Sequence, residues 1–240
     1  MKITEFTGGA THIGLLARNG VDGPEADLVK AFRHYVPRCF RWQKGDVAIF
    51  CEPQIETGFP DLVVVQYSPK VFKAWSKARS ELRLMDLKVV HHLRRVRATE
   101  SSALISMLGI DARNLLGSLE RLLDARLVTR CRRKWIPMPM GTIFGLTSIV
   151  AVEAKIKNWG DAFKQGHLNQ WFASESYILS PVEKPRSSVL ERSQRTGVGI
   201  FLLNGTKARR LRSAQKHKIP VSYVSWMFNE WIGRYLNGGM

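Results

Sequence analysis

One short segment sets the strongest limit on how this chain folds. Residues 148–157, SIVAVEAKIK, run through apolar β-formers and then reach a glutamate and a lysine. Because side chains alternate across a strand, Glu153 and Lys155 are expected on one face, with Val150 and Val152 on the other. A carboxylate and an ammonium would then emerge side by side where a buried strand reaches the surface. The simplest interpretation is an ion pair at a strand end, and the alternative is a catalytic corner.

A catalytic corner needs a second carboxylate, and one candidate lies upstream. Gly58 and Pro60 mark a turn, and Asp61 then opens a second apolar run. An aspartate at the start of a strand is by itself typical of a turn. Two apolar strands that each carry an acidic residue at one end are harder to explain by turn chemistry alone.

The acidic residues of these two strands form a motif that resembles the PD-(D/E)XK nuclease superfamily. Pro60 and Asp61 are followed later by Glu153, Ala154 and Lys155. The flanking segments follow the family's order of helix, hairpin, strand, strand, helix and strand. The resemblance covers roughly residues 20–67 and 143–204. The segments that carry it are 24–32 for the first helix, 56–61 for the hairpin, 158–166 for the later helix and 176–179 for the next strand.

This resemblance implies an α/β fold with a restriction-endonuclease-like αβββαβ core and a site for Mg²⁺, for which Mn²⁺ can substitute. Two carboxylates about 4 Å apart repel by on the order of 4 kcal/mol, so their convergence calls for a cation. Ligation by oxygen alone favours Mg²⁺ or Mn²⁺. The implied catalytic residues are Asp61, Glu153, Lys155 and Gln165; the implied metal ligands are Asp61, Glu153 and the backbone of Ala154, with Glu25 or Glu56 for a second metal.

The chain departs from the family in the distance between its two acidic strands. Glu153 follows Asp61 by 92 positions (153 minus 61), whereas the family usually joins these strands by a short connection. The intervening residues predict three helices followed by two short strands around a basic tip. This order resembles a winged helix-turn-helix module inserted between two core strands. Its expected parts are helices at 85–96 and 103–108, a third helix capped by Asp111 with Leu115, Leu119, Leu122 and Leu123 inward, and strands within 128–136.

The expected boundaries divide the chain into three segments. Residues 1–70 form the first part of the nuclease core, 71–140 the winged-helix insertion, and 141–240 the second part of the core with a basic segment. The last segment ends in a helical pattern with Trp226 and Trp231 among its apolar residues. We expect this helix to pack on the core, with a homodimer or partner-protein contact as the alternative.

The charge of the chain favours a polyanionic partner. It has 37 Lys and Arg against 20 Asp and Glu, a formal net charge of +17 and a pI near 10.2. Basic residues cluster in the first inserted helix, at the predicted wing and at 207–212. Double-stranded DNA is the expected partner, with the third inserted helix in the major groove. The predicted DNA contacts are Arg113, Asn114 and Arg121 on that helix and Arg130, Arg132, Arg133 and Lys134 on the wing.

The remaining sequence features limit the compartment. No apolar run approaches the roughly 18 residues that span a bilayer, and residues 1–6 lack a signal-peptide pattern. The protein is therefore expected in the cytoplasm, away from membranes. Cys39, Cys51 and Cys131 form no CxxC pair and fit structural roles in a reducing compartment.

These features together predict a metal-dependent DNA endonuclease, guided by its own winged-helix insert. A restriction or defence system and a mobile element are both suitable settings, because a fold does not choose between them. Two alternatives stay open: a DNA-binding regulator on an inactive nuclease scaffold, and an RNA-directed nuclease.

Overall fold

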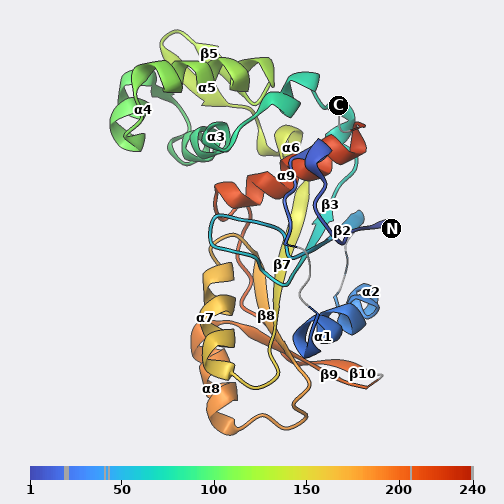
Figure 1. Ribbon diagram of the computed structural model, residues 1–240. Helices are drawn as coiled ribbons and strands as arrows, with labels where there is room; N and C mark the ends of the chain where they lie inside the picture. The colour runs from blue at the N-terminus through green and yellow to red at the C-terminus, as the bar shows by residue number, and fades with distance from the viewer. Residues whose placement is uncertain (19–21, 41, 43, 206, 239–240) are drawn as a thin grey trace. The chain divides into compact units, whose positions relative to one another are not determined.

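The fold is mixed α/β, and it is seen in a computed structural model that describes residues 1–18, 22–40, 42, 44–205 and 207–238 (Figure 1). The chain divides into two compact units. The first contains Met1–Tyr67 and Leu146–Val221, and the second contains Ser68–Gly145 and Ser222–Met240. The second unit is therefore an insertion between two strands of the first, completed by the C-terminal tail. None of the described helices has both the length and the apolar character needed to cross a membrane.

The first unit is built on a mixed sheet whose described strands follow the order β1-β2-β3-β7-β8-β9-β10. The strand pairing changes from antiparallel to parallel at β7: β2, β3 and β7 are antiparallel neighbours, and β7, β8 and β9 are parallel. The central strands are nearly continuous apolar runs because helices cover both faces of the sheet. The strands are β1 Ile3–Phe6, β2 Asp46–Cys51, β3 Leu62–Tyr67, β7 Leu146–Ala154, β8 Glu175–Ser180, β9 Gly199–Asn204 and β10 Lys207–Arg212.

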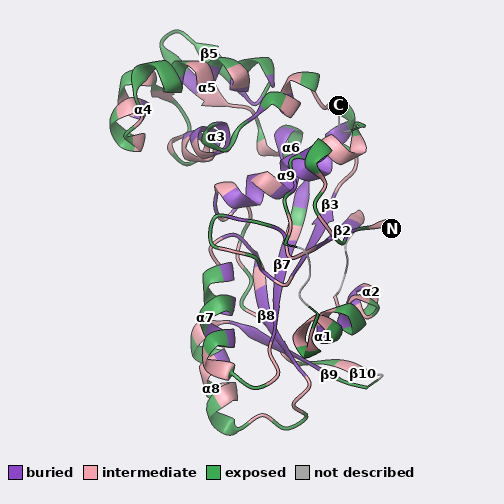
Figure 2. Cartoon of the chain, viewed as in Figure 1, coloured by how far each residue is buried: buried purple, intermediate pink, exposed green. Residues whose placement is uncertain are grey.

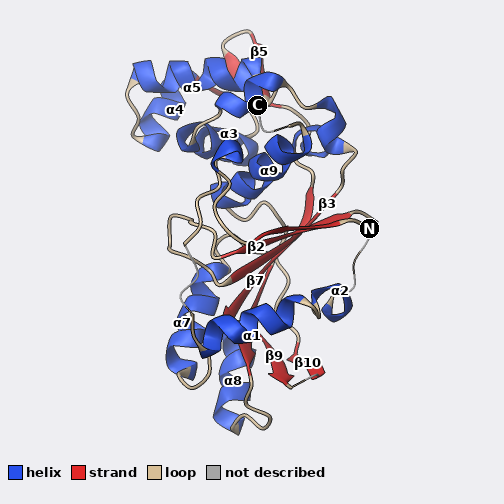
Figure 3. Ribbon diagram, turned by 45° about the vertical axis from the view of Figure 1, so that its right-hand side comes forward, coloured by secondary structure: helices blue, strands red, loops and turns tan. Residues whose placement is uncertain are grey.

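Helices lie on both faces of this sheet (Figures 1 and 3). On one face, α1 (Pro24–Arg33) and α2 (Val36–Cys39) bury Phe32 and Val36 against Val152. On the other face, α7 (Trp159–Asn169) and α8 (Ser187–Thr196) cover Ile178 and Ile200, and Phe163 of α7 is fully buried there. Figure 2 shows the buried strands between these helices and the exposed outer sides of α7 and α8.

In the second unit, three helices lie beside a small antiparallel sheet of order β4-β6-β5. The predicted helix ends are confirmed: Asp111 accepts the Asn114 N–H at 2.9 Å and starts α5, and Gly109 ends α4 with φ of 62°. The prediction that Leu123 faces inward was wrong, since this side chain is 42% exposed. The elements are α3 Leu84–Val96, β4 Thr99–Glu100, α4 Ser101–Leu108, α5 Ala112–Asp124, β5 Val128–Cys131, β6 Lys134–Pro137 and α6 Met140–Ile143, with 3-10 turns η2 Val71–Ala74 and η3 Lys77–Glu81.

The C-terminal helix α9 (Tyr223–Leu236) belongs to this second unit, which corrects the expectation that it is part of the core formed by residues 1–70 and 141–240. It contacts α3 and η3. A buried ion pair joins Glu230 of α9 to Arg79, with 2.5 Å between the guanidinium and the carboxylate. At Gly233 a Cβ would lie 1.9 Å from the Trp75 indole, so only glycine permits this contact. The apolar pattern of the tail was sufficient to predict a buried helix but not its partner.

Candidate active site

The register of the sheet brings the two predicted carboxylates together. Leu62 pairs with Val152 in the antiparallel pair of β3 and β7, so the next residue outward on each strand places Asp61 opposite Glu153. The Ala154 N–H donates to Asp61 Oδ2 at 2.8 Å, which ties the start of β3 to the end of β7. Asp61 and Glu153 are far apart along the chain but are direct neighbours where β3 begins and β7 ends.

Glu153 is an almost fully buried carboxyl group, only 3% exposed. Burial and the negative charge of Asp61 raise its pKa to about 8, while a hydrogen bond from Asn169 Nδ2 to Oε1, 2.6 Å long, partly offsets this rise. Burial also raises the pKa of Asp61, although the Ala154 N–H and the charge of Lys155 oppose it. The two carboxyl groups therefore behave as a pair that keeps a proton near neutral pH unless a cation joins them.

Lys155 lies just beyond β7, and its partner is Glu25 of α1. The Lys155 Nζ is 2.6 Å from Glu25 Oε2. No ion pair joins Lys155 to Glu153 among the described residues, so the prediction of an ion pair between these two residues at the strand end was wrong. Strand alternation no longer governs a residue after the strand's last position. Burial lowers the pKa of Lys155, but the Glu25 hydrogen bond and the charges of Asp61 and Glu153 outweigh it and raise the pKa overall. Lys155 is thus a fixed positive charge rather than a base.

Two residues that the resemblance implied lie elsewhere. Gln165 is exposed on α7, outside the buried stripe of that helix, and Asn169, one turn later, makes the contact to Glu153. Glu56 is exposed in the turn closed by the Ile55 and Gly58 pairing. The sequence position of a helix residue does not specify how the helix is rotated against the sheet, which is why Gln165 was chosen and Asn169 was missed.

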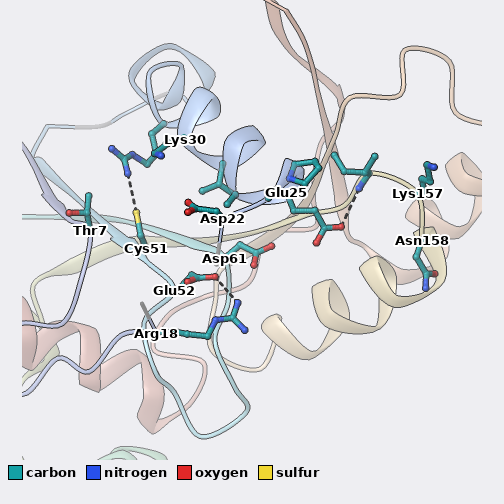
Figure 4. A pocket seen from close by; sticks show the side chains of 16 residues that line it. Thr7, Arg18, Asp22, Glu25, Lys30, Cys51, Glu52, Asp61, Lys157 and Asn158 are labelled. Atoms are coloured by element: carbon teal, nitrogen blue, oxygen red, sulfur yellow. Dashed lines mark hydrogen bonds and ion pairs between the residues drawn. The ribbon is translucent and has the colours of Figure 1, made fainter. Parts of the chain in front are cut away.

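A cavity of about 730 Å³ opens beside Asp61 (Figure 4). It lies between α1, the segment after β2 and the segment after β7. Four carboxylates and four cations line it, so its walls are balanced in charge: Asp22, Glu25, Glu52 and Asp61 with Arg18, Lys30, Arg33 and Lys157. Arg18 and Glu52 were not predicted from the sequence, and no motif distinguishes them from other charged residues.

The carboxylate pair suits a hard divalent cation. Mg²⁺ binds through one or two carboxylates and keeps several waters, which Asp61 and Glu153 can satisfy. Burial and the charge of Asp61 raise the pKa of Glu153, so a cation would favour the ionised form of the pair. In the described part of the chain, no group of three or more His, Cys, Asp and Glu side chains is placed to hold a metal ion. Any metal here would therefore rely on this pair, a backbone oxygen and water.

The residues predicted to contact DNA fall into two groups in the second unit. Arg121 is not available, because its guanidinium donates two hydrogen bonds to the buried Asp86, at 2.9 and 2.8 Å. Asn114 is hydrogen-bonded to the capping residue Asp111. The remaining predicted contacts are exposed: Arg113 on α5, and Arg130, Arg132, Arg133 and Lys134 in the hairpin of β5 and β6.

Comparisons with known proteins do not extend this description. A scan against protein-family models and searches of curated proteins and solved structures find no match to the chain. Function therefore has to be argued from the chemistry of the site.

Proposed function

We propose that this chain is a metal-dependent endonuclease of the PD-(D/E)XK type that hydrolyses phosphodiester bonds of DNA. The observation that carries the proposal is the junction of Asp61 and Glu153 at adjacent strand ends, with Lys155 as a fixed cation beside them. The order α1, β2, β3, β7, α7, β8 supports a restriction-endonuclease-like αβββαβ core, with the second unit as its winged-helix insert.

The catalytic roles follow from charge and position. A bound Mg²⁺ would polarise the scissile phosphate and lower the pKa of a coordinated water. Asp61 and Glu153 would hold the ion through their carboxylate oxygens. Lys155 would stabilise the negative charge that develops on the phosphate as water attacks phosphorus and the bond to the leaving oxygen breaks. Asn169 would keep Glu153 oriented and favour its ionised form, because its amide donates to that carboxylate.

The second unit would supply affinity for the duplex. Arg132, Arg133 and Lys134 are exposed at the tip of a hairpin, where side chains can reach phosphates, and Arg113 is exposed near the start of α5. A net charge of +17 favours the same partner. A nuclease that carries its own DNA-binding module would suit a restriction, defence or mobile-element system.

Cleavage of a supercoiled plasmid tests the proposal directly. The native chain and the variants Glu153→Gln and Lys155→Ala are assayed with and without Mg²⁺ or Mn²⁺, alongside DNA binding. Glu191→Gln and Lys184→Ala, exposed on the same unit, are matched controls. We expect metal-dependent nicking that falls at least about 100-fold in both site variants while binding persists. Binding without cleavage under every metal condition would instead favour a DNA-binding regulator, and preferential cutting of RNA would favour an RNA-directed nuclease.

A further inference from the structure

Arg18 is held beside the cavity by its main chain. Its N–H donates to the Glu52 carbonyl oxygen at 3.1 Å, and the Gln54 N–H donates to the Leu16 carbonyl oxygen at 2.8 Å. A bridge between Ala17 and Pro53 lies between these two bonds. The segment that carries Arg18 is therefore paired, residue by residue, with the segment that leaves β2.

Glu52 has an unusual backbone conformation for a glutamate. Its φ is 44°, in the left-handed region that side chains other than glycine rarely adopt, and its N–H donates to the Asp61 carbonyl oxygen at 3.1 Å. Such a conformation persists only where the surroundings compensate for it, and it clusters at functional sites. One carboxylate oxygen of Glu52 lies 2.6 Å from Arg18, and the other is buried without a hydrogen-bond partner among the described residues. This backbone places the carboxylate where it can hold Arg18.

The Arg18 guanidinium is oriented but not saturated. The Arg18 side chain is 46% exposed and lines the same cavity as Asp61 (Figure 4). Its guanidinium lies 5.5 Å from the centre of the Phe59 ring. The described residues include no other side-chain hydrogen bond to Arg18, so donors remain for a ligand. The hydrogen bond that Arg18 donates to Glu52 outweighs burial and, with the charges of Asp61 and Glu153, raises the pKa of Arg18. Arg18 therefore keeps its positive charge in this environment.

A phosphodiester that approaches Asp61 passes close to carboxylates, so it depends on the cations that line the same cavity for favourable contacts. Arg33 is bound to Glu5 at 3.1 Å and to the Cys51 sulfur, and its side chain is only 22% exposed, against 46% for Arg18. Lys30 and Lys157 are exposed lysines with mobile ammonium groups and no planar fork. Arg18 is the pre-oriented guanidinium of the cavity, and guanidinium geometry matches two phosphate oxygens.

We propose that Arg18, oriented by the positioning residue Glu52, binds a non-bridging oxygen of the substrate phosphodiester beside Asp61. This inference rests on the proposed function, and it adds a guanidinium contact to the phosphodiester beside the roles of the carboxylate pair and Lys155. Glu52 acts through Arg18 and does not itself touch the substrate.

The test uses the full chain and a short DNA duplex, with cleavage kinetics and binding measured for Arg18→Ala, Arg18→Lys and Glu52→Gln. Arg38→Ala, an exposed arginine of α2 outside the cavity, is the matched control. A charge-assisted hydrogen bond corresponds to a loss of about 10- to 100-fold in kcat/KM for Arg18→Ala. We expect partial rescue in Arg18→Lys, an intermediate loss in Glu52→Gln, and circular dichroism spectra unchanged from the native chain.

A chemical change in the substrate separates contact from structure. Single neutral methylphosphonates are placed in turn at the phosphates around the cleaved bond. One of them should lower kcat/KM for the native chain and have little further effect on Arg18→Ala, because both changes remove the same contact. Equal losses in native and Arg18→Ala chains at every position, or native kcat/KM in Arg18→Ala, would overturn the inference and leave the proposed function intact.

Failure of the proposed function is recognised separately. If the native chain cuts no DNA with Mg²⁺ or Mn²⁺, binding of the same duplexes decides the role of Arg18. A weaker affinity in Arg18→Ala than in Arg38→Ala, with the same methylphosphonate dependence, supports the contact. Equal affinities overturn it.

Discussion

The raised pKa of Glu153 predicts how stability depends on pH. A carboxyl group whose pKa is higher in the folded chain binds its proton more tightly when folded. Its contribution to stability is therefore greatest below its ordinary pKa of 4.5, and it is lost as the pH rises to about 8. At 1.36 kcal/mol per pH unit, a rise from 4.5 to about 8 corresponds to about 5 kcal/mol of unfolding free energy.

Glu153→Gln isolates this contribution. Glutamine keeps an oxygen that can accept the Asn169 hydrogen bond and removes the charge that burial and Asp61 oppose. Urea unfolding in metal-free buffer between pH 4.5 and 9 measures both chains. The native free energy of unfolding should fall relative to the variant by about 1.4 kcal/mol per pH unit between pH 4.5 and about 8, and the difference should level off above that pH. The control Glu191→Gln, exposed on α8, should run parallel to the native chain.

Mg²⁺ provides the second half of this experiment. A cation that binds the ionised pair should restore the stability of the native chain above pH 8 and leave Glu153→Gln unchanged, since ligand binding to the folded state alone is stabilising. Native and Glu153→Gln curves that stay parallel from pH 4.5 to 9 would refute the reasoning, because they would mean that Glu153 ionises no less readily when the chain is folded.

Other parts of the structure make predictions of the same kind. Asn169→Leu removes the amide that stabilises ionised Glu153, so the pH of half-maximal cleavage should move upward; an unchanged pH profile would contradict this role. Asp86→Ala leaves the Arg121 guanidinium without its buried partner and should lower the unfolding free energy of the second unit by about 3 kcal/mol in urea titrations. Arg133→Ala and Lys134→Ala should each reduce the slope of log affinity for DNA against log salt concentration by about 0.9 if the two side chains contact phosphates. Arg121→Ala should leave this slope unchanged, and a similar reduction would show that the Arg121–Asp86 ion pair opens on DNA.

The sequence was most informative where structure is local. Runs of apolar β-formers predicted β3 and β7, and the cap residues Asp111 and Gly109 marked the ends of helices, because these signals depend on neighbours along the chain. The acidic residues at the strand ends were also found this way. Their convergence could be expected only through the family resemblance, since the inserted unit separates the two strands.

Only the tertiary structure decided which partners these residues meet. The rotation of α7 places Asn169, and not Gln165, in hydrogen-bond contact with Glu153. The packing of α1 places Glu25 where it forms an ion pair with Lys155. Arg121 was predicted to contact DNA because it lies off the leucine stripe, but in the structure its guanidinium is hydrogen-bonded to Asp86. The pairing of Arg18 with Glu52 depends on backbone contacts between segments that no pattern links. Side-chain partners across a fold depend on packing and register, and a one-dimensional pattern of apolar and charged residues contains neither.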